Sequence, residues 1–119
     1  MGTGRPSDSP GDWIGRWLRV EIDRPLGSRH PRFPRTVYAA NYGFVPGTHA
    51  ADGAEVDAYV LGIDRPLTRF EGRCIAILRR GTDVEDKLVV APDGFGPDDD
   101  AILAAVDFVE RFFGPAVIR

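Results

Sequence analysis

The chain has 119 residues, of which 43% are hydrophobic, and its formal net charge is −3. This length fits one domain with a core of its own, and the acidic balance argues against nucleic acid as the main partner, because nucleic-acid-binding domains are usually basic. The sequence contains no signal-peptide pattern and no long apolar stretch, so we expect a cytoplasmic protein with no membrane partner.

The first predicted element is a strand that follows a polar N-terminal segment. We expect residues 1–11, which are rich in Gly, Pro, Ser and Asp, to form a disordered tail, and residues 12–119 to form a single domain. Leu18, Val20 and Ile22 alternate with charged residues. This period of two is typical of a half-buried strand.

Four more strands are predicted further along the chain. Prolines and a glycine interrupt residues 24–35 and indicate an irregular loop. The strands are then expected over residues 36–45, 55–61, 73–79 and 86–91. Each of these stretches is apolar or alternates apolar with polar residues, as strands do.

The C-terminal part of the chain predicts a helix. Pro97 and three aspartates after it suit a helix start. Apolar residues then recur at spacings of three and four from Ile102 to Phe113, and Gly114-Pro115 is expected to end the helix. Five strands and one helix predict a mainly β chain with α, either a small barrel or a strongly curled sheet closed by the C-terminal helix.

Three carboxylates lie within six positions, at Asp52, Glu55 and Asp57. Carboxylates this close repel one another unless a cation lies among them, and ligands that are all oxygen favour magnesium, manganese or calcium. Glu55 and Asp57 share one face of their strand with Tyr59, because side chains alternate. The alternative interpretation is a solvated acidic loop rim.

A second acidic group consists of Asp83, Glu85 and Asp86, directly before Lys87. If this stretch is extended, Asp83, Glu85 and Lys87 point the same way. Two strand ends that carry carboxylates could then face each other and hold one or two Mg²⁺ ions, which would polarise a phosphoryl oxygen.

Other residues could contact a phosphate. Arg29 and Arg32 lie in the proline-rich loop and could supply cations, or the loop could be an exposed basic segment that balances the acidic surface. Tyr42 could donate its phenol to a phosphate oxygen, or pack in the sheet. His30 and His49 could act as ligands or bases, although loop histidines more often have surface or structural roles.

Four segments resemble, in order and spacing, the soluble family I inorganic pyrophosphatases. They are Val20 to Ile22 with Gly27-Ser28, Tyr38 to Thr48, Asp52 to Asp57, and Glu85 to Pro92. The resemblance implies a closed five-stranded OB-like barrel packed by helices. It also implies Mg²⁺-dependent hydrolysis of pyrophosphate to phosphate by metal-activated water, in a cytoplasmic homo-oligomer, a hexamer or trimer.

The resemblance also implies roles for single residues in the first acidic group. Asp52 and Asp57 match the outer carboxylates of the family's acidic signature and would bind metal. Ala54 stands where the family has the aspartate that activates water, and Glu55 beside it is the candidate replacement as general base.

The later segments depart further from the family pattern. Lys87 matches the phosphate-binding lysine, and Tyr42 the phosphate-facing tyrosine. One metal-binding aspartate of the family aligns near Arg80, so Asp83 would have to replace it. The family has a hairpin between the segments that match Gly27-Ser28 and Tyr38 to Thr48, and this chain has the shorter proline-rich loop with Arg29 and Arg32 there. Phe112 and Phe113 stand near the end of the helix, where the family has a Tyr-Lys pair.

The sequence therefore predicts a shortened, divergent pyrophosphatase-like hydrolase that acts on pyrophosphate or a related phosphoanhydride. The alternative is a non-catalytic oligomeric domain that binds metal or a phosphate ligand on the same barrel. The predicted site residues are Glu55 and Asp57 for catalysis, Arg29, Arg32, Tyr42 and Lys87 for substrate, and Asp52, Asp57, Asp83, Glu85 and Asp86 for metal.

Overall fold

The computed structural model describes residues 13–50, 53–80 and 86–119. The elements within them are β1 (Trp17–Arg24), β2 (Asn41–Val45), β3 (Val56–Val60), β4 (Arg69–Arg79), β5 (Asp86–Ala91), α1 (Asp99–Glu110) and β6 (Ala116–Ile118). In this part of the chain, no helix has both the length and the apolar character needed to cross a membrane.

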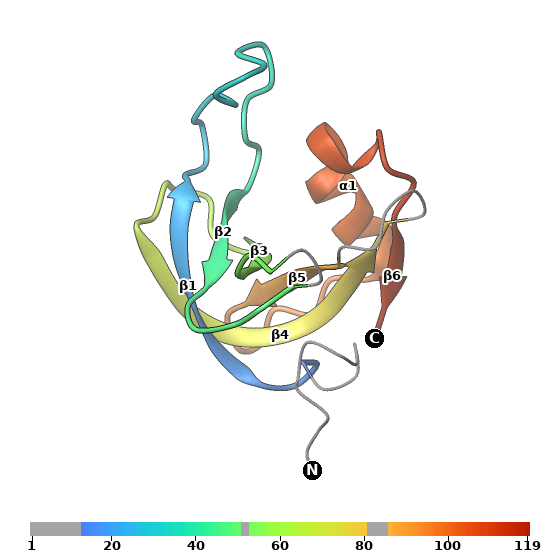
Figure 1. Cartoon of the computed structure of the whole chain (residues 1–119). Helices are drawn as coiled ribbons and strands as arrows, with labels where there is room; N and C mark the ends of the chain where they lie inside the picture. The colour runs from blue at the N-terminus through green and yellow to red at the C-terminus, as the bar shows by residue number, and fades with distance from the viewer. Residues whose placement is uncertain (1–12, 51–52, 81–85) are drawn as a thin grey trace.

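Five strands close into a barrel. They are hydrogen-bonded in the order β1-β2-β3-β5-β4, and β4 pairs back onto β1, so that the ring closes. The β3–β5 pair is parallel, and the other pairs are antiparallel. Figure 1 shows β1 and β4 bending strongly around the barrel, with α1 on one side. The predicted fold class, a mainly β chain forming a five-stranded OB-like barrel packed by a C-terminal helix, is confirmed.

Apolar side chains separate into two buried clusters. The first joins residues of all five barrel strands, among them Val20, Ala58 and Leu88, and fills the barrel. The second lies between the barrel and α1, where Tyr59 of β3 packs with Ile102. The alternation of strand side chains produces this division, because each strand has one face toward the barrel interior and one toward the outside, where α1 covers β3, β4 and β5.

A glycine allows β1 and β2 to pack closely. A side chain at Gly43 would overlap the carbonyl oxygen of Glu21 in β1. The pairing of β1 with β2 is irregular just beyond this point, between Ile22 and Arg24. Close backbone approach is a common reason for a glycine inside a strand.

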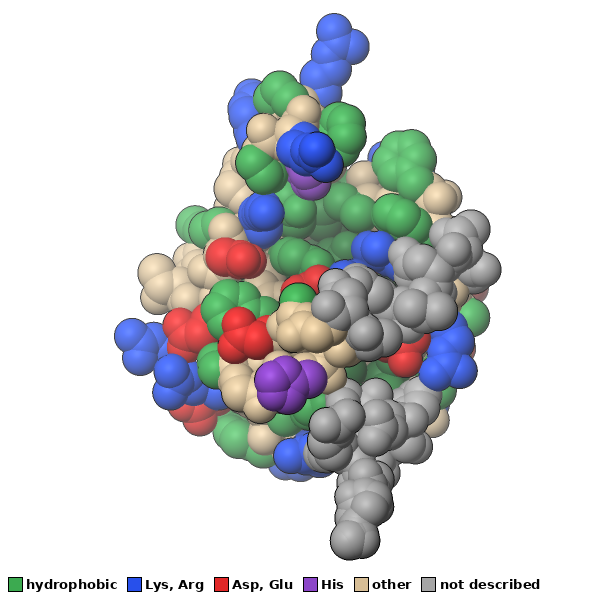
Figure 2. All heavy atoms as spheres, in the orientation of Figure 1, with side chains coloured by type: hydrophobic (Ala, Val, Ile, Leu, Met, Phe, Trp, Pro, Cys, Tyr) green, Lys and Arg blue, Asp and Glu red, His purple; other side chains and the backbone are tan. Residues whose placement is uncertain are grey.

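The second strand is shorter than predicted. It begins at Asn41 rather than at residue 36, because residues 36–38 fold back on residues 27–30. The backbone N–H of His30 donates to the carbonyl of Thr36 (2.9 Å), and that of Tyr38 donates to the carbonyl of Ser28 (2.8 Å). Residues 25–38, here called the arm, project from the barrel beside α1 (Figure 1). Hydrophobic side chains gather in the hollow below it (Figure 2).

The other boundaries differ less from the prediction. β4 starts at Arg69, four residues before the predicted start at residue 73, because its N-terminal part pairs with β1. The helix ends at Glu110, so Phe112 and Phe113 lie in the turn that follows it. The C-terminal residues, for which the sequence left pairing open, form β6 on β4. The predicted tail, residues 1–11, lies outside the described residues.

Replacing Gly43 by alanine should destabilise the barrel by about 2 kcal/mol or more, because the added methyl must displace β1 backbone. Urea unfolding followed by circular dichroism measures the change. The control is Gly96→Ala, since a methyl there meets nothing within 4 Å and should leave the unfolding midpoint almost unchanged. Equal midpoints for the two variants would contradict a close β1–β2 contact.

Candidate functional site

Asp57 and Lys87 meet on the outer face of the barrel. Ala58 of β3 is aligned with Leu88 of the parallel β5, and both side chains belong to the interior cluster. The preceding residue of each strand therefore points outward, toward the helix side. The Lys87 Nζ lies 2.6 Å from the Asp57 Oδ2. Parallel pairing thus places a carboxylate and an ammonium side by side.

The ion pair is unequal in its access to solvent. Lys87 is only 4% exposed, whereas the side chain of Asp57 is half-buried. Removing an ammonium from water is costly unless an anion compensates for its charge. Asp57 therefore stabilises the buried lysine and still presents oxygen lone pairs at the surface.

The Tyr42 phenol of β2 lies near the same carboxylate and interacts with it. Its pKa is raised well above the usual value of 10, first by burial and then by the charge of Asp57 and the hydrogen bond to it. The phenol therefore stays protonated at neutral pH and acts as a donor. Three groups from three neighbouring strands converge here.

A second buried ion pair joins the barrel to α1. The Arg80 Nη2 and Nε lie 2.7 Å and 3.0 Å from the two carboxylate oxygens of Glu110, and the Tyr59 hydroxyl donates to the same carboxylate at 2.7 Å. Burial, and then the charge and hydrogen bond of Glu110, raise the pKa of Tyr59 well above its usual range. The guanidinium also lies 3.8 Å from the ring centre of Phe113.

The two ion pairs are neighbours. The rings of Tyr42 and Tyr59 pack edge to face, 4.8 Å between centroids, and the positive charge of Arg80 acts on the Tyr42 phenol to lower its pKa, against the larger effects that raise it. We call Tyr42, Asp57, Arg80 and Lys87 the central polar site. It places two cations, a phenol donor and a carboxylate on one face of the barrel.

Two predicted site carboxylates lie elsewhere. Glu55 is exposed just before β3 and accepts a hydrogen bond from the Gly47 N–H at 3.3 Å, so it also holds the turn between β2 and β3. Asp86 is paired with Arg79 at 3.2 Å. It is adjacent to Lys87 in the strand, and its side chain therefore points to the opposite face.

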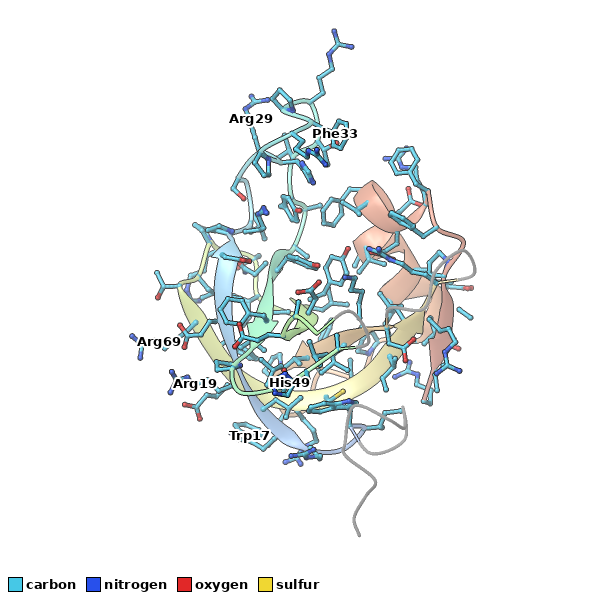
Figure 3. All side chains as sticks on the ribbon, in the orientation of Figure 1. Trp17, Arg19, Arg29, Phe33, His49 and Arg69 are labelled. Carbon is cyan, nitrogen blue, oxygen red and sulfur yellow. The ribbon has the colours of Figure 1, made fainter. Side chains whose placement is uncertain are left out.

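The predicted phosphate-binding arginines lie in the arm. The Arg29 Nη1 donates to the Pro34 carbonyl at 2.8 Å, and Arg32 is exposed. Figure 3 shows Arg29 on the projecting arm, away from the barrel. The structure thus brings Tyr42, Asp57 and Lys87 together, but not the arm arginines with them.

The remaining predicted ligands, Asp52, Asp83 and Glu85, lie outside the described residues. Over residues 13–50, 53–80 and 86–119, no three Asp, Glu, His or Cys side chains gather as a metal-binding cluster. The central polar site contributes the carboxylate oxygens of Asp57, and hard cations prefer oxygen ligands.

Sequence reasoning missed the role of Glu110. The sequence contains a signal for it, because Glu110 continues the four-residue spacing of Ile102 and Val106. In the structure all three residues are buried. A charged residue that continues an apolar helical stripe should have a buried partner. That partner is Arg80, which the sequence comparison marked only as the position where the family has a metal-binding aspartate.

Replacing Glu110 by alanine should lower the free energy of unfolding by about 3 kcal/mol, because it leaves the Arg80 charge without its buried carboxylate. The matched control is Asp107→Ala. That residue forms an exposed i,i+4 ion pair with Arg111 and should cost less than about 1 kcal/mol. Urea unfolding compares them. An equal loss in both variants would show that the buried pair contributes no more than a surface pair.

Comparison with known proteins identifies the family. The model described as inorganic pyrophosphatase matches residues 18–108. An inorganic pyrophosphatase of Neisseria meningitidis is 32% identical over 104 residues, which cover 71% of this chain and 58% of that protein. The chain thus spans less than two thirds of the length of this relative.

Solved structures agree in fold. A Helicobacter pylori pyrophosphatase superposes with a TM-score of 0.59 at 23% identity, over 89% of this chain and 83% of that one. A Coxiella burnetii pyrophosphatase gives 0.62 at 21%, over 83% and 76%. With the family match over most of the barrel and helix, the chain belongs to the inorganic pyrophosphatase family.

Proposed function

We propose that this protein hydrolyses inorganic pyrophosphate, or a related phosphoanhydride, to phosphate with Mg²⁺ as its cofactor. The observation that carries the proposal is the convergence of Tyr42, Asp57 and Lys87 from three adjacent strands, in a chain of the pyrophosphatase family. Phosphoryl transfer depends mainly on positioning the phosphates and stabilising their charge, and these groups suit that task.

The cations would bind the substrate's phosphates. Lys87 can turn from Asp57 to a phosphate oxygen, and Arg80 lies close enough to Tyr42 for its charge to act there. The protonated Tyr42 phenol donates a hydrogen bond and has no negative charge to repel the substrate. Each cation is paired with a carboxylate, Lys87 with Asp57 and Arg80 with Glu110, so a phosphate binds by taking the place of that carboxylate at a site that water screens little.

Magnesium fits the donors of this site. Mg²⁺ is commonly held by one or two carboxylates together with substrate phosphates, and Asp57 is the described carboxylate in position to hold it. When bound, the ion would polarise a phosphoryl oxygen and make a bound water more acidic. Asp52, Asp83, Glu85 and Asp86 stay predictions as further ligands.

Three roles remain predictions from the sequence. Glu55 is the candidate that accepts the proton of the attacking water, although it lies outside β3 and accepts a hydrogen bond from the Gly47 N–H. Arg29 and Arg32 would reach a phosphate only if the arm moved toward the barrel. We also propose that residues 12–119 act as a single domain in a cytoplasmic homo-oligomer, a trimer or hexamer, as the family resemblance implies.

The second candidate is a non-catalytic domain that binds metal or a phosphate ligand. One observation favours it: Lys87 neutralises Asp57 at 2.6 Å, so this carboxylate is already paired. A catalytic carboxylate must give up that pairing when substrate binds.

A phosphate-release assay distinguishes the candidates. We expect phosphate release from pyrophosphate with Mg²⁺ present, loss of release with excess EDTA, and recovery when Mg²⁺ is added back. Calorimetric binding of pyrophosphate without any release would support the non-catalytic domain instead.

Replacing Asp57 by asparagine should lower phosphate release by at least about 100-fold, the scale expected when a group acting on the reacting water is lost. The amide oxygen can still accept a hydrogen bond from Lys87, so circular dichroism should show a folded chain. Asp93→Asn is the control, because its ion pair with Arg73 is exposed. Unchanged activity in Asp57→Asn would remove Asp57 from the site.

A further inference from the structure

A cavity lies between the arm and the C-terminal end of α1. Its volume is about 420 Å³, and aromatic rings make up most of its wall, from Phe33 on the arm and from Phe108, Phe112 and Phe113 at the helix end. Small-molecule sites usually measure about 300–1,000 Å³. The space-filling view shows hydrophobic side chains in this hollow, with Lys and Arg side chains around it (Figure 2).

Two of the four phenylalanine rings of the cavity are poorly covered by the protein itself. Phe112 is 72% exposed and Phe33 is 62% exposed, although large aromatic side chains gain free energy when they are buried. Phe33 is labelled on the arm in Figure 3. Aromatic faces on both sides of an open space suit a flat ring, which can stack on them.

His30 also lines the cavity. Its Nδ1 accepts the backbone N–H of Arg32 at 3.0 Å and of Phe33 at 3.3 Å. A nitrogen that accepts these bonds has no proton, so in the neutral ring the proton is on Nε2. The cavity therefore combines aromatic surface with an N–H donor, which matches a heteroaromatic ring that has nitrogen acceptors better than a saturated or branched chain.

The cavity adjoins the central polar site. Phe113 contacts the Arg80 guanidinium, 3.8 Å from its ring centre. On the other side, Phe108 packs on Tyr38 at 5.3 Å between centroids, and Tyr38 packs on Tyr42 at 5.8 Å. A ligand with phosphates at Arg80 and Lys87 would therefore extend its organic part toward the cavity.

We propose that this cavity binds the base of a nucleoside diphosphate, whose phosphates occupy the central polar site. The inference rests on the proposed function and names its substrate class. The phosphate chain would compete with Glu110 and Asp57 for Arg80 and Lys87, the two ion-paired cations that adjoin the cavity. A bare pyrophosphate would use the polar site and leave the aromatic wall uncovered.

The reaction is a hydrolysis that needs only water as co-reactant. The water oxygen forms a bond to the terminal phosphorus, and the bond from that phosphorus to the bridging oxygen breaks. The bridging oxygen keeps the electron pair and leaves as part of the nucleoside monophosphate. A carboxylate of the site accepts the water proton and releases it to solvent, so ADP and water give AMP, phosphate and one proton.

The test uses the full chain, with ADP as the probe. Calorimetry in Mg²⁺ measures the Kd for ADP, and phosphate release measures KM for ADP and for pyrophosphate. Phe112→Ala should raise the Kd and KM for ADP about tenfold, as expected when one stacking contact is lost, and leave KM for pyrophosphate within about twofold. Trp17→Ala is the control, since Trp17 is an exposed aromatic residue on β1 that does not line the cavity (Figure 3).

The outcomes separate this inference from the proposed function. Pyrophosphate hydrolysis without ADP binding, or ADP binding that Phe112→Ala does not weaken, overturns the cavity assignment alone. Tighter binding of geranyl diphosphate than of ADP overturns it in favour of an aliphatic group. A lower mass of Phe112→Ala by light scattering overturns it in favour of a second copy of the chain. No phosphate release, but ADP binding that depends on Phe112, supports the cavity and refutes the hydrolase.

Discussion

The pairing of β1 with β4 closes the barrel, and the arrangement of the site depends on this closure. Once the ring is closed, every strand has an inner and an outer face. The parallel β3 and β5 then lie side by side, with Asp57 and Lys87 both on the outer face. An open sheet in which the strand register can shift would not fix that alignment, because a register shift of one residue moves each side chain to the other face.

The outer face contains two cations that are largely withdrawn from water. Lys87 is held by Asp57, and Arg80 by Glu110. Buried ion pairs contribute little net stability, since the cost of desolvation offsets the attraction between the charges. Their value here is positional, because positive charge is fixed beneath the helix side of the barrel before any ligand arrives. Under the proposed function, a polyanion would have to exchange with Asp57 or Glu110 for these cations.

Local patterns in the sequence predict the barrel well and its site only in part. Alternation in residues 55–61 correctly puts Asp57 and Tyr59 on one face, because period two is a property of the strand itself. It could not show that residues 36–38 pair with residues 27–30 within the arm instead of extending β2, since those contacts are made between backbone groups. The Arg80–Glu110 pair joins residues thirty positions apart, and no local spacing reveals such a partner. The ligand roles of Asp52, Asp83 and Glu85 remain predictions.

The arm has its own internal hydrogen bonds, such as those from His30 to Thr36 and from Tyr38 to Ser28. Its conformation is thus set largely apart from the barrel strands that hold Asp57 and Lys87. Under the proposed cavity assignment, changes in the arm would alter the organic group that binds there, while Asp57 and Lys87 stay in place. If the proposed function and cavity assignment hold, selectivity and reactivity would be carried by separate parts of one small chain, and each could be engineered without the other.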